Sequence, residues 1–181
     1  MNFFTFLLIL LILSGSGALV YVFYFNKMQY LRTKIEHSES IIDETLRIRY
    51  DYLVRIDNIT KSSLNDSKEY FKEYMNLKNK NITNFELDRK LKEAFNIVYK
   101  LKDDFEELGK NKEFKEILNS IKETDEKIAA ITNYYNKNTN DLNGFIRKFP
   151  SAIIAKIHKF QIKPFFDGKD MTDDIYDDFK L

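Results

Sequence analysis

The sequence predicts an all-α protein: an N-terminal transmembrane helix, then an up-and-down antiparallel four-helix bundle with a short C-terminal helix and a tail. Three observations lead to this fold class. Only 5 of the 181 residues are glycine and 2 are proline, so the chain has little turn chemistry. Residues 3–25 carry no charge. Beyond them, apolar residues recur every three or four positions, which is the spacing of one helix face.

The predicted membrane anchor is residues 1–26, with the span at about 3–25. As a helix, the span would be roughly 35 Å long, enough to cross the hydrocarbon core of a bilayer. A cleaved signal peptide is the main alternative, because residues 14–18 are small. However, no Lys or Arg precedes the apolar run, and hydrophobicity resumes at Leu19. We therefore expect an uncleaved anchor whose partner is the lipid bilayer.

Basic residues near the span predict its orientation. Lys27, Arg32 and Lys34 follow it and none precedes it. The positive-inside bias therefore predicts a single-pass protein of the cell membrane, with the N-terminus outside and the bundle in the cytoplasm. Ser14 and Ala18 stand four apart. Such small residues either let two membrane helices approach closely or are simply tolerated in a span, so the oligomeric state stays open.

The first two bundle helices are read from their apolar residues. The first continues from the membrane to about residue 62, where Ser and Asn residues interrupt the pattern. Asp66 and Glu69 resemble the start of a second helix. The apolar stripe of the first helix is Met28, Leu31, Ile35, Ile42, Leu46, Leu53, Ile56 and Ile59; that of the second is Tyr70, Phe71, Tyr74, Met75 and Leu77.

The third and fourth helices have coiled-coil-like seams. A capping box at residues 83–86 opens the third helix, Gly109 is expected just after its end, and Asn111 caps the fourth. Thr124 and Asn138 are polar at seam positions, where they either fix the register or face water. The seam of the third helix is Leu87, Leu91, Ala94, Val98, Leu101, Phe105 and Leu108; that of the fourth is Phe114, Ile121, Ile128, Tyr135, Leu142 and Phe149.

Composition excludes several kinds of chemistry. The chain has no cysteine and only two histidines, His37 and His158, which excludes disulfides, thiolate catalysis and cysteine-bound metals. A net charge of +1 argues against nucleic-acid binding. The acidic residues at 103–107 flank an apolar seam residue and are expected to face solvent. We therefore predict no enzyme activity, no catalytic, metal or cofactor-binding residues, and no cofactor.

One stretch near the C-terminus is unusual. Residues 142–166 contain no acidic side chain, whereas basic and apolar residues alternate there. Helix four should end level with the anchor, which makes this stretch a possible membrane-contact patch. The alternative is that the apolar residues cap the bundle end and the lysines face water. The acidic tail, residues 167–181, is expected to be flexible. The patch residues are Arg147, Lys148, Lys156, Lys159, Lys163, Ile153, Ile154, Ile157 and Phe160.

Three blocks of the sequence resemble the LemA family of bacterial membrane-anchored proteins: residues 24–51, residues 108–114 and residues 135–166. The resemblance implies one membrane helix and a four-helix bundle, here residues 27–166, but it implies no known activity. The chain departs from the family at Val54, where the family has proline, at Leu142, where it has tyrosine, and at Lys159, where it has glycine. The family-motif residues in the third block are Tyr135, Asn136, Phe149, Pro150, Ser151, Phe165 and Phe166.

These observations favour a non-catalytic interaction or scaffold protein at the cell membrane, with protein partners that the sequence does not identify. The alternative is an enzyme that uses carboxylates brought together only by the fold.

Overall fold

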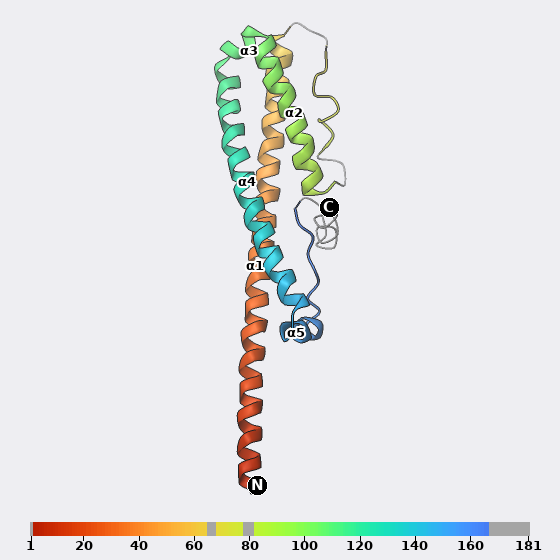
Figure 1. Ribbon diagram of the computed structural model, residues 1–181. Helices are drawn as coiled ribbons and strands as arrows, with labels where there is room; N and C mark the ends of the chain where they lie inside the picture. The colour runs from red at the N-terminus through yellow and green to blue at the C-terminus, as the bar shows by residue number, and fades with distance from the viewer. Residues whose placement is uncertain (1, 65–67, 78–81, 167–181) are drawn as a thin grey trace, which may run out of the picture. The chain divides into compact units, whose positions relative to one another are not determined.

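The computed structural model describes residues 2–64, 68–77 and 82–166. Five α-helices and no strand are found among these residues, which confirms the all-α prediction (Figure 1). The chain divides into two compact units. We call residues 1–37 with 134–181 the anchor unit, and residues 38–133 the core unit. The helices are α1 (Phe3–Ser63), α2 (Asn84–Asp104), α3 (Glu106–Lys110), α4 (Lys112–Arg147) and α5 (Ser151–Ile157).

Helix α1 is continuous over 61 residues, as predicted. Val54 replaces the family's proline, so every backbone N–H that the helix needs is present there. Among the described residues, α1 is the one helix that is long and apolar enough to cross a membrane, and its most apolar window is fully exposed. Further along, the predicted stripe from Met28 to Ile59 is buried. One helix thus has an apolar, exposed beginning and an amphipathic remainder.

The core unit has an apolar interior of aliphatic and aromatic side chains. Residues 38–63 of α1, all of α2 and α3, and α4 up to residue 133 contribute to it. The helix starts match the predictions. Thr83 Oγ1 accepts a hydrogen bond from the Glu86 N–H at 3.2 Å, and Asn111 Oδ1 accepts one from the Phe114 N–H at 3.0 Å. The predicted seam residues buried here include Leu91, Ala94, Val98, Leu101, Leu108, Phe114, Ile121 and Ile128.

The predicted second helix is wrong for the residues that are described. Residues 70–77 form a series of turns with bonds such as Tyr74 N–H to Phe71 C=O at 2.9 Å. Phe71, Tyr74 and Leu77 are still buried, Phe71 completely, whereas Tyr70 and Met75 are half-buried. The Tyr50 hydroxyl donates to the Met75 carbonyl and so ties these turns to α1. Asp66, the predicted helix start, lies outside the described residues.

The end of the third predicted helix also differs. Helix α2 stops at Asp104 because Phe105 has an extended backbone, with φ −123° and ψ 103°. The short helix α3 follows, and Gly109 lies inside it. Leu108 remains buried despite the break. The seam spacing therefore predicted burial correctly but missed the change in chain direction.

The anchor unit contains residues 3–37 of α1, residues 134–147 of α4, helix α5 and the segment 158–166. Pro150 immediately precedes α5. The prediction that Phe149 is a seam residue is wrong, because Phe149 follows the end of α4 and is 83% exposed. Of the two polar seam positions, Asn138 is buried and donates to the Tyr134 carbonyl at 2.7 Å. Thr124, in the core unit, is half-buried.

Candidate functional site

Clustered carboxylates are not a feature of the described residues. No group of three or more His, Asp or Glu side chains there is arranged to hold a metal ion. Asp103, Asp104, Glu106 and Glu107 are all exposed, as predicted, and His37 is exposed too. The residues that are brought together lie instead in the anchor unit, around the end of α4.

A buried serine shapes the corner between α4 and α5. The Ser151 hydroxyl lies 2.7 Å from the Phe145 carbonyl and 2.8 Å from the Lys148 carbonyl. Carbonyls in the last turn of a helix lack intrahelical partners. Ser151 therefore supplies a donor where α4 needs one, which explains why the Pro150–Ser151 pair of the motif stands at this corner.

Helix α5 ends with a lysine in an unusual backbone conformation. Lys159 has φ 54°, in the left-handed region that favours glycine. The Phe160 N–H donates to the Ala155 carbonyl at 2.9 Å and the Lys159 N–H to the Lys156 carbonyl at 3.3 Å. These two bonds are a Schellman motif, which typically has glycine at this position. The family's glycine is thus replaced by lysine at the one residue here where a side chain is disfavoured.

Three polar residues of α4 hold the C-terminal segment. Asn143, which is fully buried, donates to the Lys163 carbonyl at 2.8 Å and accepts from the Lys163 N–H at 2.9 Å. The Tyr135 hydroxyl donates to the Pro164 carbonyl at 3.0 Å. Asn136 Oδ1 accepts from the Phe166 N–H at 2.8 Å. We call Tyr135, Asn136 and Asn143 the clamp. The clamp assigns a structural role to the Tyr-Asn motif.

Aromatic residues near the end of the predicted span contact the region after α4. The Tyr21 hydroxyl is hydrogen-bonded to His158 Nε2, and the Phe25 ring lies 4.4 Å from the His158 ring. The Tyr24 ring lies 5.9 Å from the Phe145 ring. All of these contacts are within the anchor unit. They bring the ends of α4 and α5 beside residues 21–25.

The predicted patch residues divide into two groups. Ile153 is 55% exposed and Ile157 is 62% exposed, on one face of α5 because they are four residues apart. Ile154 is buried, and Phe160 is half-buried with its ring 6.4 Å from that of Phe25. Ile154 and Phe160 therefore belong to the interior of the anchor unit and not to its exposed face. Arg147, Lys148, Lys156 and Lys159 are exposed, and Lys163 is half-buried beside the clamp.

A lysine close to the span sits between two tyrosines. Lys34 Nζ lies 4.3 Å from the centre of the Tyr30 ring and 5.6 Å from that of Tyr134. The hydrogen bond between Lys34 and Tyr30 raises the pKa of Lys34 and lowers that of Tyr30. Lys34 therefore stays positively charged at neutral pH.

The core unit contains a buried cation that the sequence patterns did not reveal. Arg49 is 0% exposed, forms an ion pair with Asp125 and lies 4.9 Å from the Phe95 ring centre. Its Nε and Nη2 atoms have no hydrogen-bond partner within the described part of the chain. In the sequence, the burial of Arg49 was indicated by its position in the apolar stripe of α1, between Leu46 and Leu53.

The structure thus defines a class: an all-α protein with a long apolar N-terminal helix and a C-terminal segment held on α4 by a polar clamp. The sequence model of the LemA family matches residues 38–176. The chain belongs to the LemA family. A search among curated proteins finds no match.

Proposed function

We propose that this LemA family member is a non-catalytic interaction or scaffold protein, anchored in the cell membrane by residues 3–25. The observation that carries the proposal is the uncharged, exposed start of α1, which continues without a break into an amphipathic helix. Burying such a surface in lipid is favourable, whereas leaving it in water is not. Protein partners would bind residues 27–166 in the cytoplasm.

The proposed orientation rests on Lys27, Arg32 and Lys34, which follow the span. It is tested by adding protease outside intact cells that make the full chain with a C-terminal epitope. We expect residues 27–181 to survive until the membrane is permeabilised. Digestion of the epitope from outside would reverse the orientation.

We further propose that the exposed patch around α5 lies on the inner leaflet. Its support is the contact between His158 and both Tyr21 and Phe25, at the end of the apolar run where tyrosines favour the headgroup zone. Exposed Ile153 and Ile157 would enter the interface. Each basic residue close to anionic lipid would add about 1 kcal/mol.

Vesicle binding by residues 27–181 tests the patch. We expect binding to vesicles that contain anionic lipid, weaker binding to neutral vesicles, and loss of the difference when the five patch cations become glutamine. A matched variant replaces five lysines of the core unit, at positions 92, 100, 115, 122 and 127, and should bind as the unmodified protein does. Equal binding to both kinds of vesicle would leave α5 with a structural role only.

A further inference from the structure

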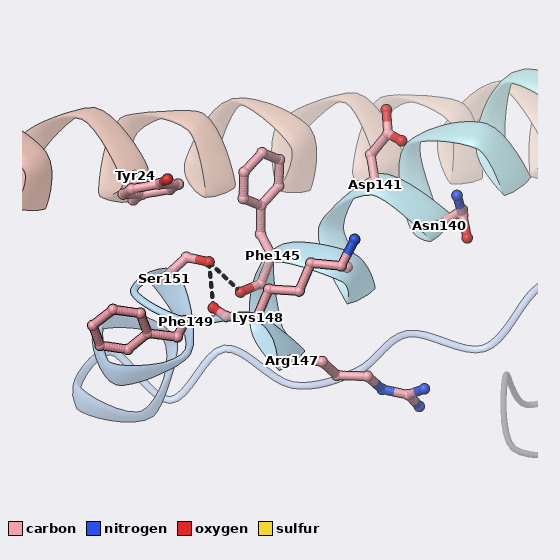
Figure 2. Close-up of a pocket in the computed structure, with 9 residues that line it drawn as sticks. Tyr24, Asn140, Asp141, Phe145, Arg147, Lys148, Phe149 and Ser151 are labelled. Carbon is pink, nitrogen blue, oxygen red and sulfur yellow. Dashed lines mark hydrogen bonds between the residues drawn. The ribbon is translucent and has the colours of Figure 1, made fainter.

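We propose that the cavity at the end of α4 binds the headgroup of a phospholipid that carries both a phosphate and a primary ammonium group. The inference rests on the proposed membrane contact and deepens it, because it names one lipid class. The cavity has a volume of about 440 Å³, within the range of small-molecule sites. It is lined by Tyr24 of α1 and by residues of α4 and the corner before α5 (Figure 2).

The lining changes in character along α4. Tyr24, Phe145 and Phe149 provide aromatic surface at the end nearer the predicted span, and Lys148 provides a cation beside them. Asp141 and Asn140 line the cavity two helical turns earlier in α4. Figure 2 shows Lys148 extending along α4 toward Asp141, whereas Arg147 points away from Tyr24. Moving away from the span, the order is therefore apolar, cationic, anionic.

This order matches a phospholipid with an amine headgroup. Its acyl chains lie in the bilayer, its phosphate comes next and its ammonium group extends furthest. Lys148 Nζ would donate to phosphate oxygens, and the Asp141 carboxylate would accept from the ammonium group. Asp141 and Lys148 are both exposed, and no ion pair of either side chain is found within the described ranges.

The hydrogen-bond acceptors that line the cavity also predict which lipid headgroup it prefers. A primary ammonium group has three N–H donors for Asp141 and the Asn140 carbonyl oxygen, whereas the quaternary ammonium of choline has none. A glycerol headgroup has no positive charge for Asp141. The site should therefore prefer an ethanolamine headgroup to a choline or glycerol headgroup when the acyl chains are identical.

Native mass spectrometry of the full chain in detergent tests this inference. The probes are phosphatidylethanolamine, phosphatidylcholine and phosphatidylglycerol with the same acyl chains. We expect the unmodified protein to bind the ethanolamine lipid roughly threefold to tenfold more tightly than the choline lipid, the effect of one charge-assisted hydrogen bond in a partly hydrated site. Asp141→Asn should reduce this ratio to about one, while Lys148→Gln should weaken binding of all three lipids.

Matched controls are Glu126→Gln and Lys137→Gln, which remove exposed charges on α4 that do not line the cavity; neither should change the ratio. Equal binding of the ethanolamine and choline lipids by the unmodified protein would overturn the inference. So would a ratio that Asp141→Asn leaves unchanged. If selectivity is absent while the patch cations still support binding to anionic vesicles, the proposed function stands and only the headgroup site falls. If neither headgroup selectivity nor binding to anionic vesicles is observed, both the headgroup site and the proposed membrane contact are wrong.

Discussion

Different interactions stabilise the interior of the core unit and that of the anchor unit. In the core unit, apolar side chains such as Phe114, Ile121 and Ile128 fill the interior, and apolar burial dominates. In the anchor unit, polar side chains of α4 bind the backbone of residues 163–166. An interior of the first kind tolerates similar apolar residues, whereas a clamp requires particular donors and acceptors.

The largest effect is expected from a charge in the core unit. Ile128→Asp puts a carboxylate at a position that is 2% exposed, where water cannot solvate the charge. The loss should be at least about 3 kcal/mol, a large part of the ~5–15 kcal/mol that stabilises a domain. Urea unfolding of residues 27–181, followed by circular dichroism, measures it. Ala94→Asp should behave alike, whereas Glu126→Asp, on the exposed face, should unfold as the unmodified domain does.

The buried Arg49 allows a comparison within the core unit between an unpaired buried charge and an apolar replacement. Asp125→Ala leaves the Arg49 cation buried without its carboxylate and should cost about 1–3 kcal/mol, less than a fully buried pair because the Asp125 side chain is 42% exposed. Arg49→Met removes the charge, keeps most of the volume and should cost less. The same urea titration compares them. A larger loss in Arg49→Met would mean that the ion pair itself is strongly stabilising.

The clamp should affect the anchor unit alone. Asn143→Ala removes both hydrogen bonds to Lys163, a local loss of about 1–3 kcal/mol. Amide hydrogen exchange should therefore become roughly tenfold to a hundredfold faster at Lys163, while the core unit keeps its protection. Asn140→Ala, at an exposed position on the same helix, is the control. Unchanged exchange at Lys163 would show that the clamp does not hold this segment.

The smallest expected effect is a gain in stability. Lys159→Gly relieves a side chain from a backbone with φ 54° and should stabilise the end of α5 by about 0.5–1 kcal/mol. Lys156→Gly, inside α5, should instead destabilise it by a similar amount. Exchange of the Phe160 amide, which bonds to the Ala155 carbonyl, reports on both. Faster exchange in Lys159→Gly would contradict the assignment.

The sequence predicted the parts of the fold that depend on periodic burial. The long α1, both caps at Thr83 and Asn111, and the seams of α2 and α4 follow from helical spacing and local hydrogen bonding. The turns at 70–77 were missed because buried aromatic residues at helical spacing also suit consecutive turns. Phe149 was misplaced because a heptad pattern does not report where a helix ends.

The candidate site was only partly predictable. The basic and apolar stretch was recognised, but the clamp and the contacts of His158 depend on a chain that folds back over α4. A pairing between Asn143 and Lys163 leaves no periodic trace in the sequence. Likewise, Ile153 and Ile154 are neighbouring residues of the same type, and only the placement of α5 decides which of them is exposed.

The most direct test of the account is the depth of α5 in a bilayer. The chain has no cysteine, so Ile157→Cys gives a single site for a nitroxide label in the full chain, reconstituted into vesicles. Collision rates with oxygen and with a water-soluble nickel complex measure depth, with Val22→Cys in the span and Glu126→Cys in the core unit as references. We predict that the label at 157 favours oxygen, between the two references. A label at 157 as open to nickel as the one at 126 would contradict a membrane-bound α5.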